Sequence, residues 1–358
     1  MRLMTARDQR PSLRFVEGIN VELTYGCQLD CPHCLQADQR ARGETAWADP
    51  EPIRRALIEA LDLGLIRTGI NFTGGEILRA GSPLPALLET TRALGVPVRL
   101  NTNGWWGRAR RFLVGKLRFD SAEVLIGWLQ AMGVAVLALS IDERYGRYPG
   151  LWSSNVAIVR RCERLRQPYE LIFTGLTGDR IDAWRRRLAD ETATDLGMMA
   201  IRDMERVDIG AAAGRLDRGT EDDRQPLARL RQTDCALRGF YRPAFLHLAP
   251  DGGVRSCLYA VGAGWLGNIR TQSLRAIAEG FSGNPVTACF SGANFERTVT
   301  QVLPTQSEPA RRLRHPCGLA ATLARRIACD RLRSSAITGY SGDRRQRHGQ
   351  AGDGTNGG

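Results

Sequence analysis

With 358 residues, 43% of them hydrophobic, the chain has ample apolar content for a buried core, so a disordered polypeptide is excluded. No apolar run approaches the roughly 20 residues that a membrane span needs, and the charged start lacks the apolar stretch of a signal peptide; we therefore expect a cytoplasmic protein without a membrane partner. The net charge of +12 comes from arginines spread along the chain, whereas nucleic-acid-binding faces cluster basic and aromatic residues. We therefore expect no nucleic-acid partner.

The first predicted strand, Ile19 to Thr24, leads into Cys27, Cys31 and Cys34, a C-x3-C-x2-C spacing. Thiolates are soft ligands that select zinc or iron–sulfur clusters, and nine cysteines in an unexported protein favour metal ligation over disulfides. A zinc site would need a fourth Cys or His at a comparable spacing. His33 is a poor fourth ligand, because it lies inside the loop between cysteines that already occupy that corner of the site. The loop therefore predicts an iron–sulfur site in which three ligands leave one iron of a four-iron cluster open.

Apolar strand-like runs then alternate with amphipathic helical stretches as far as about residue 210, a pattern typical of βα units around a parallel sheet. The further expected strands are Gly69 to Thr73, Pro97 to Asn101, Val134 to Ile141, Tyr169 to Phe173 and Met198 to Arg202. The expected helices are Asp49 to Leu63, Pro83 to Leu94, Asp120 to Met132, Asn155 to Arg166 and Ile181 to Thr192. In parallel barrels, functional groups collect at the carboxyl ends of the strands.

Three short polar motifs stand at such strand ends. The second strand ends in Thr73-Gly74-Gly75-Glu76, the third in Asn101-Thr102-Asn103-Gly104, and the fourth in Ser140-Ile141-Asp142. Each alone is typical of an ordinary turn, since Gly, Ser, Asn and Asp are common turn residues. Their joint position at successive strand ends favours a shared binding site.

The cysteine loop and the Gly-Gly-Glu motif together resemble the radical S-adenosylmethionine (radical SAM) enzymes. The resemblance implies a partial (β/α)6 TIM-like barrel, and a 4Fe-4S cluster on Cys27, Cys31 and Cys34 whose open iron is chelated by SAM. It also implies an electron donor such as a flavodoxin or ferredoxin, and a 5′-deoxyadenosyl radical that abstracts hydrogen from carbon. By the same resemblance the residues expected to bind SAM are Gly74, Gly75, Glu76, Asn101, Asn103 and Ser140, with Asp142 beside the ribose and the substrate.

Five further cysteines lie in the last third of the chain: Cys235, Cys257, Cys289, Cys317 and Cys329. The segment Pro250 to Cys257, with Gly252 five residues before the cysteine, resembles the hairpin of SPASM and twitch domains. A single auxiliary 4Fe-4S cluster in a twitch-like domain matches the sparse later cysteines better than two clusters. The resemblance assigns Cys235, Cys257 and Cys317 as ligands and Cys289 as the fourth, whereas Cys329 fits a structural role.

The expected organisation is an N-terminal extension (1–18), the barrel (19–215), the twitch-like domain (216–333) and a tail (334–358). The tail is rich in Gly, Arg and polar residues, a composition typical of disorder. The expected fold class is α/β.

Two reactions stay open. An auxiliary cluster that accepts the electron of the substrate radical makes a dehydrogenase, whereas a cysteine that returns a hydrogen atom makes an epimerase. Cys289, if it is not a ligand, is then the candidate hydrogen donor, and Asp142 is the second catalytic candidate. Cys162, in a predicted barrel helix, is more often structural.

The expected substrate is a small molecule, because fewer than twenty residues precede the first strand and a leader-peptide-binding module is not seen there. An amino sugar or aminocyclitol of antibiotic biosynthesis is favoured, with loop acids as partners of its ammonium groups. These acids are Asp142, Glu143, Asp203, Glu205 and Asp208. The alternative is a radical SAM maturase of a ribosomally made peptide.

Overall fold

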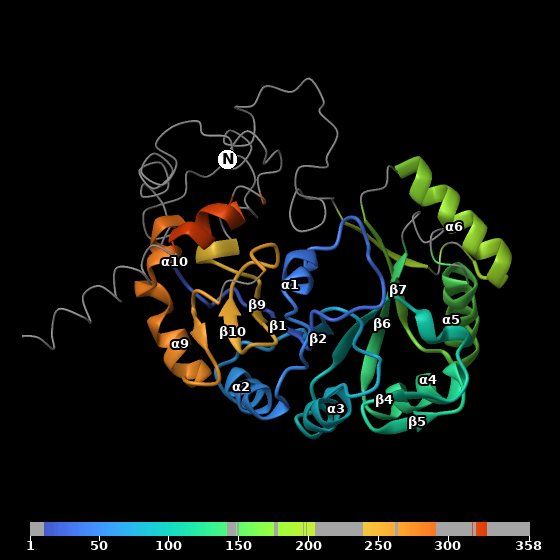
Figure 1. Ribbon diagram of the computed structural model, residues 1–358, viewed down its shortest axis with the longest axis horizontal. Helices are drawn as coiled ribbons and strands as arrows, with labels where there is room; N and C mark the ends of the chain where they lie inside the picture. Colours follow the sequence, from blue (N-terminus) through green and yellow to red (C-terminus); the bar gives the residue numbers. More distant parts are fainter. Residues whose placement is uncertain are drawn as a thin grey trace, which may run out of the picture.

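The computed structural model describes residues 11–141, 148, 150–174, 178–195, 197, 199–204, 239–261, 264–290, 317 and 320–327. Nine strands of these residues form one sheet in the order β11-β10-β9-β1-β2-β3-β6-β7-β8 (Figure 1). Their bounds are β1 Gly18–Glu22, β2 Gly69–Thr73, β3 Val98–Thr102, β6 Val134–Ile141, β7 Tyr169–Thr174, β8 Ala200–Met204, β9 Phe245–Leu248, β10 Gly253–Arg255 and β11 Gly267–Asn268. The strands from β9 to β8 pair in parallel, and only β10 and β11 are antiparallel.

Long helices connect consecutive parallel strands. They are α2 Pro50–Asp62, α3 Leu84–Ala93, α4 Ala122–Ala131, α5 Leu151–Leu165 and α6 Gly178–Thr192. Two begin at side-chain caps: Asp49 accepts the N–H of Glu51 at 3.1 Å before α2, and Ser121 accepts that of Val124 at 3.4 Å before α4. Such caps satisfy backbone donors that a helix start leaves unpaired, which fixes where each helix begins.

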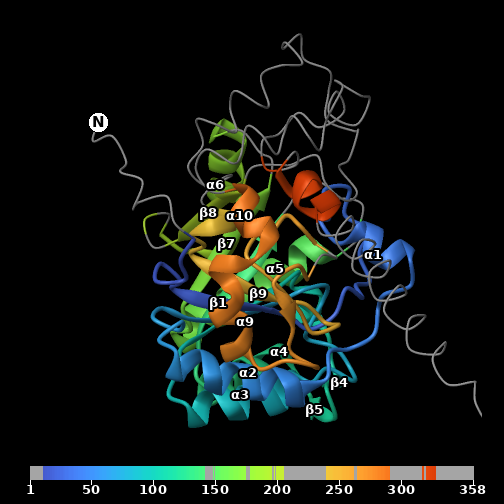
Figure 2. The ribbon, with the colours of Figure 1, turned by 90° about the vertical axis from the view of Figure 1, so that its left-hand side faces the viewer.

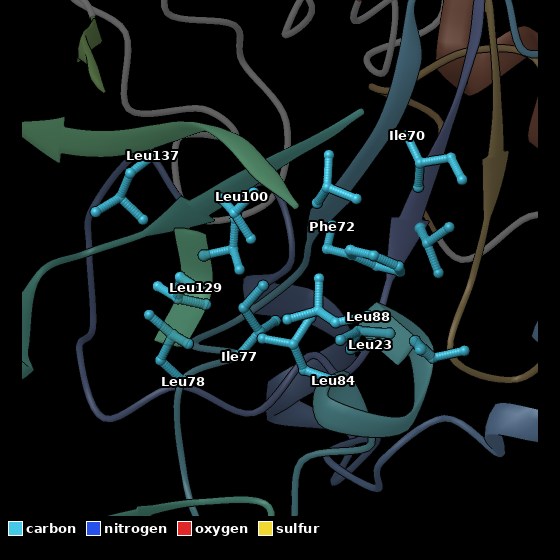
Figure 3. Packing of buried hydrophobic residues seen from close by; sticks show 14 of the residues in the cluster. Leu23, Ile70, Phe72, Ile77, Leu78, Leu84, Leu88, Leu100, Leu129 and Leu137 are labelled. Carbon is cyan, nitrogen blue, oxygen red and sulfur yellow. The ribbon is translucent and has the colours of Figure 1, made fainter. Parts of the chain in front are cut away.

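One face of the sheet is apolar and packs against these helices. Figure 3 shows Ile70, Phe72 and Leu100 of the sheet against Leu84 and Leu88 of α3, and all five are buried. Because side chains alternate along a strand, every second residue of β1, β2, β3, β6 and β7 reaches this core. Burying each such large side chain contributes roughly 2 kcal/mol.

The opposite face of the same strands is polar. Asn20 and Asn71 are paired in register on β1 and β2, and the Asn71 Nδ2 donates to Asn20 Oδ1 at 2.9 Å. Arg99 of β3 donates to Asn71 Oδ1 at 3.0 Å and to Glu170 Oε2 of β7 at 2.8 Å. Arg202 of β8 bonds the other Glu170 oxygen at 2.7 Å. A hydrogen-bonded row of polar side chains therefore crosses this face of the sheet, which lies opposite the helices and which we call the inner face.

The remaining described elements are shorter. They are α1 Ala37–Ala41, the 3-10 helix η2 Trp105–Arg108, the hairpin β4 Phe112–Val114 with β5 Leu117–Phe119, α9 Leu274–Gly280, the 3-10 helix η6 Phe281–Gly283 and α10 Pro285–Phe290. The helix α9 lies beside α2 (Figures 1 and 2), where Glu59 accepts the Arg275 N–H at 2.9 Å. Among the described helices, none is long and apolar enough to cross a membrane.

The structure confirms the α/β class and the parallel sheet. All six predicted strands and five predicted helices are present, with bounds that differ by a few residues at their ends. The pairing of β9 with β1 was not predicted, and it places segments from before and after residue 215 in one sheet. The partial barrel, the twitch-like domain and the domain boundaries stay predictions. The whole predicted tail (334–358) and residues 205–238 lie outside the described ranges.

Candidate functional site

The cysteine loop begins directly beyond β1, at the carboxyl edge of the sheet. Cys27 and Cys31 pack against a small apolar cluster built on Leu29 of the loop and Leu151 of α5. The Leu29 N–H points to the Cys27 sulfur at 3.4 Å, and the Arg40 guanidinium lies 3.6 Å from the Cys34 sulfur. Burial raises the pKa of the Cys27 thiol, and the Leu29 N–H opposes that effect.

The Gly74-Gly75 pair lets the second strand end lie directly against this loop. Gly74 has φ +129°, and a Cβ there would meet the Thr24 carbonyl oxygen at 2.5 Å. A Cβ on Gly75 would lie 1.9 Å from the Gly26 oxygen. The backbone uses the proximity: Gly75 N–H donates to Thr24 O at 2.7 Å and Glu76 N–H to Gly26 O at 3.0 Å. Only glycine allows this approach, which gives the Gly-Gly motif a physical reason.

Glu76 joins the second strand end to the third. Its carboxylate is fully buried and accepts the N–H groups of Leu78 and Asn103, each at 2.9 Å, and the Thr102 hydroxyl at 3.0 Å. Burial raises the pKa of Glu76 to about 7, although these donors oppose the shift by stabilising the anion. The carboxyl group therefore titrates near neutral pH while it holds the Asn103 segment in place.

Asn103 contacts the cysteine loop. Its Nδ2 lies 3.7 Å from the Cys27 sulfur, and its Oδ1 accepts the Trp105 N–H at 3.0 Å. Helix α5 supports the segment from outside, because Asn155 Nδ2 donates to Asn103 O at 3.2 Å and Ser154 Oγ donates to the Gly104 O at 2.7 Å. The cysteine loop, the Gly-Gly-Glu turn and the Asn103 segment thus meet at the carboxyl ends of β1, β2 and β3.

The other predicted SAM-binding residues lie apart from this contact. Asn101 is on the polar inner face, where Arg99 donates to its Oδ1. Ser140, half-buried on β6, is on the same face by strand register, since Asn101 pairs with Ala138 two residues earlier. Asp142 lies outside the described residues, as do Glu143, Glu205, Asp208 and the side chain of Asp203.

The later cysteines come together on one apolar cluster. Cys257, Cys289 and Cys317 all pack against the cluster that contains Phe240 and Phe290. Cys257 and Cys317 also contact a second cluster, Ala260 with Ala321, that includes Leu35 from the N-terminal cysteine loop. Cys235 and Cys329 are outside the described part of the chain. Cys162 is fully buried in the main core, and burial raises the pKa of its thiol to about 12.

The donor chemistry of the N-terminal loop fits an iron–sulfur group. Three thiols stand in one short loop, and N–H donors are directed at the sulfurs of Cys27 and Cys34, the kind of hydrogen bond that stabilises cluster-bound thiolates. The side chains are not gathered into a ligand set: among the described residues, no group of three or more His, Cys, Asp or Glu is arranged to hold a metal ion. The fit is thus one of residue type and surroundings.

Sequence reasoning missed three site residues, of which Glu22 and Arg255 act together. Both side chains are fully buried and form an ion pair at the level of the cysteine loop. A charged residue inside the apolar strand segment Ile19 to Leu23 was a signal that could have found Glu22. Tyr148, whose hydroxyl accepts the Asp30 N–H at 2.6 Å, left no such signal because its partner is distant in sequence.

No protein-family model matches the chain. Among curated proteins, the PqqA peptide cyclase of Streptomyces rochei is 34% identical over 99 residues, which are 26% of this chain and 25% of that protein. Those of Xanthomonas euvesicatoria pv. vesicatoria (strain 85-10) and Xanthomonas axonopodis pv. citri (strain 306) are 30% identical over 132 residues, 35% of this chain and 29% of theirs. The resemblance to the radical SAM superfamily is confirmed.

The chain spans under a third of the length of these curated relatives. A solved structure, BtrN in complex with AdoMet and 2-DOIA, aligns at 15% identity over 79% of this chain and 89% of that one. Its TM-score of 0.44 is too low to establish a shared fold. The radical SAM resemblance implies SAM and one 4Fe-4S cluster as cofactors. The auxiliary cluster stays a prediction.

Proposed function

We propose that this protein is a radical SAM enzyme whose reaction centre lies at the carboxyl ends of β1, β2 and β3. The observation that supports it best is the direct contact among the cysteine loop, the Gly-Gly-Glu turn and the Asn103 segment. In this proposal Cys27, Cys31 and Cys34 hold the four-iron cluster. When bound, that cluster and SAM supply a 5′-deoxyadenosyl radical that takes a hydrogen atom from a carbinol carbon.

The neighbouring residues have distinct tasks. Gly74 and Gly75 keep side chains out of the space between the turn and the loop. Glu76, which is mainly ionised above its pKa of about 7, then places negative charge where the SAM ammonium is expected and fixes the Asn103 backbone. The Asn103 amide contacts the loop at Cys27, and Ser140 and Asn101 offer hydrogen bonds from the inner face. These groups bind and orient SAM.

The later cysteines are proposed to bind one auxiliary cluster in a twitch-like domain that follows a partial barrel. Cys257, Cys289 and Cys317 share one apolar cluster, which supports a common site, and Cys235 is the proposed fourth ligand. If these cysteines hold a cluster, it would supply an acceptor for the electron of a substrate radical, and the protein would be a dehydrogenase. If Cys289 is instead not a ligand, its thiol would return a hydrogen atom to the substrate radical, which makes an epimerase; the electron donor and a proton would then restore the thiol from the thiyl radical. Asp142 is proposed beside the substrate.

The favoured substrate is a small hydroxyl- and amine-bearing molecule such as an amino sugar or aminocyclitol. The polar inner face of the sheet supports it, since the row from Asn20 to Glu170 offers donors and acceptors suited to hydroxyl groups. Modification of a ribosomal peptide is the second candidate, favoured by the PqqA peptide cyclase relatives. An electron donor such as a flavodoxin or ferredoxin is required in either case.

Iron counting tests the cluster assignment. Anaerobically reconstituted wild type is expected to hold about eight irons, and the Cys27→Ala/Cys31→Ala/Cys34→Ala variant about four. Cys162→Ala is the matched control, because Cys162 lies in the main core away from both cysteine groups, and it is expected to keep the wild-type count. Zinc in place of iron, or an unchanged count in the triple variant, would contradict the proposal.

Product analysis separates the substrates. The reduced protein is incubated with SAM and either an aminocyclitol panel or a short precursor peptide, and masses are compared. Loss of a hydrogen pair indicates dehydrogenation, whereas deuterium uptake from heavy water at unchanged heavy-atom composition indicates epimerisation. Turnover of the peptide alone would replace the small-molecule proposal by the maturase.

A further inference from the structure

A buried ion pair joins the N-terminal cysteine loop to the segment that carries Cys257. Arg255 Nη2 lies 2.7 Å from Glu22 Oε2, and each side chain is only 1% exposed. Glu22 is the last residue of β1, just before the cysteine loop, and Arg255 is the last residue of β10, two positions before Cys257. The pair therefore links the strand ends from which the two cysteine groups depart.

Hydrogen bonds extend the link at both ends. Gln36 Nε2, two residues beyond Cys34, donates to the Glu22 Oε1 at 3.1 Å. Arg255 Nε donates to the backbone oxygen of Cys257 at 3.2 Å. A continuous polar path thus runs from the end of one cysteine loop to the main chain of the other cysteine.

Simple stabilisation explains this arrangement poorly. Two charges taken out of water lose hydration that their attraction barely repays, so a buried pair is weak evidence for stability. The surroundings add to the cost: Tyr25 Oη, His247 Nδ1 and Arg255 Nη1 are buried without a hydrogen-bond partner among the described residues. The polar cluster thus lowers the stability of the fold, which favours a functional role for it beside the cysteine groups.

The charges that face Arg255 define its electrostatic effect. A guanidinium stays protonated in proteins, and Arg255 Nη2 lies 2.7 Å from the Glu22 Oε2. His247, paired with Arg255 across β9 and β10, is neutral because burial and the guanidinium lower its pKa. The guanidinium is thus a permanent buried cation that acts on Cys257 and is balanced by Glu22.

We propose that Arg255, held by Glu22, is a positioning residue that fixes the Cys257 segment against the N-terminal cysteine loop and makes an iron–sulfur group bound through Cys257 easier to reduce. The inference rests on the auxiliary cluster of the proposed function. Reduction adds negative charge, so a nearby cation stabilises the reduced form and raises the reduction potential. In a poorly hydrated interior this effect is stronger than in water.

Removing Arg255 and removing Glu22 are expected to shift the auxiliary reduction potential in opposite directions. Arg255→Met removes the cation and leaves Glu22 unbalanced, so the auxiliary reduction potential falls. Glu22→Gln removes the anion and leaves the guanidinium unbalanced, so the potential rises. The double variant Glu22→Gln/Arg255→Met removes both charges, so its potential is expected between those of the two single variants and below the wild-type value, because Arg255 is the charge bonded to the Cys257 segment. A merely structural role would not produce shifts of opposite sign.

The experiment is an anaerobic redox titration followed by electron paramagnetic resonance. Each variant is made in the Cys27→Ala/Cys31→Ala/Cys34→Ala chain, so that only the auxiliary signal remains, and iron is counted first. If a single variant fails to fold because it buries an unpaired charge, the double variant and Arg255→Lys are compared instead. Arg255→Lys keeps the charge without the planar fork, so its potential is expected to exceed that of the double variant. Equal potentials would overturn the inference.

A second readout needs no cluster. In the full-length protein before reconstitution, alkylation of Cys257 is followed by peptide mass spectrometry, and protection of the buried Cys162 shows that the fold is intact. Loss of the Arg255 contact in Arg255→Met is expected to make Cys257 react severalfold faster than in the wild type. An unchanged rate would overturn the positioning role. Absence of iron in the triple-alanine chain would instead contradict the auxiliary cluster, so the two failures are distinguishable.

Discussion

Glu76 shows how one residue can both shape a site and make it depend on pH. Its carboxylate receives bonds from Leu78, Thr102 and Asn103, and burial raises its pKa from 4.5 to about 7. The folded chain therefore binds this proton more tightly than the unfolded chain. The stability that this proton contributes is fully present below pH 4.5 and is lost as the pH rises through about 7.

Urea denaturation without SAM tests this residue. Between pH 5 and pH 8, the wild type is expected to lose on the order of 3 kcal/mol of unfolding free energy through this group. Glu76→Gln removes that slope, and costs about 1 to 3 kcal/mol at acid pH because its amide meets a backbone N–H. Parallel stability profiles for the two proteins would show that Glu76 is not the titrating group.

SAM affinity is expected to have the opposite pH dependence. Because the ionised Glu76 is proposed to face the SAM ammonium, binding strengthens as the pH rises through about 7. Equilibrium dialysis at pH 6 and pH 8 is expected to show about tenfold weaker binding at the lower pH, and no such difference in Glu76→Gln. Equal affinities of the wild type at both pH values would remove the proposed contact.

Gly75 provides a steric prediction at the same scale. In Gly75→Ala the new Cβ would meet the Gly26 oxygen at 1.9 Å, so the turn and the cysteine loop must separate. We expect a loss of about 2 to 3 kcal/mol in stability and reduced iron loading. Gly127→Ala is the control: Gly127 lies in helix α4 with open space around its Cβ position, and alanine there is expected to add about 0.5 to 1 kcal/mol. Full iron loading of Gly75→Ala would refute the close-approach argument.

At the scale of the elements, the inner face of the sheet is held by one carboxylate between two cations. Glu170 of β7 binds Arg99 of β3 and Arg202 of β8, across strands that are not all neighbours. Although burial opposes it, the two guanidinium groups lower the pKa of Glu170. Its stabilisation is therefore present above the pKa of the unfolded chain and is lost as the pH falls through the lower folded value.

Glu170→Gln is expected to destabilise the protein by about 1 to 3 kcal/mol at pH 7, because the half-buried Arg99 and the exposed Arg202 lose their charged partner. The difference from wild type should shrink as the pH falls below 4. Glu123→Gln is the matched control, since the Arg164–Glu123 pair is 60% and 47% exposed and such pairs contribute at most about 1 kcal/mol. Equal urea midpoints for the two variants at pH 7 would contradict the role of Glu170.

The elements also show which parts of the fold can be predicted from sequence. The strands from β1 to β8 that alternate with helices carry a local signal, since apolar residues recur with the period of their element. The partner of β9 carries no such signal: Phe245 to Leu248 looks the same whichever strand it joins, and its pairing with β1 depends on the folded chain. The same reason hid the Glu22–Arg255 pair, whose members are hundreds of positions apart.

At the scale of the whole molecule, one sheet organises both cysteine groups. The N-terminal loop departs from β1 and the Cys257 segment from β10, and β9 lies between these strands and pairs with both. The motifs at the ends of β1, β2 and β3 were predictable because parallel strands bring their carboxyl ends together. The grouping of Cys257, Cys289 and Cys317 was predicted from the resemblance to twitch domains, whereas the apolar cluster against which they pack comes from distant segments.

The most direct test of the central claim is SAM cleavage. The anaerobically reconstituted protein is incubated with SAM and dithionite, and methionine and 5′-deoxyadenosine are measured by liquid chromatography. The account predicts that the wild type and Cys162→Ala form 5′-deoxyadenosine and that Cys31→Ala forms none. If the iron-loaded wild type forms no 5′-deoxyadenosine, or if Cys31→Ala forms as much as the wild type, the proposed reaction centre is contradicted.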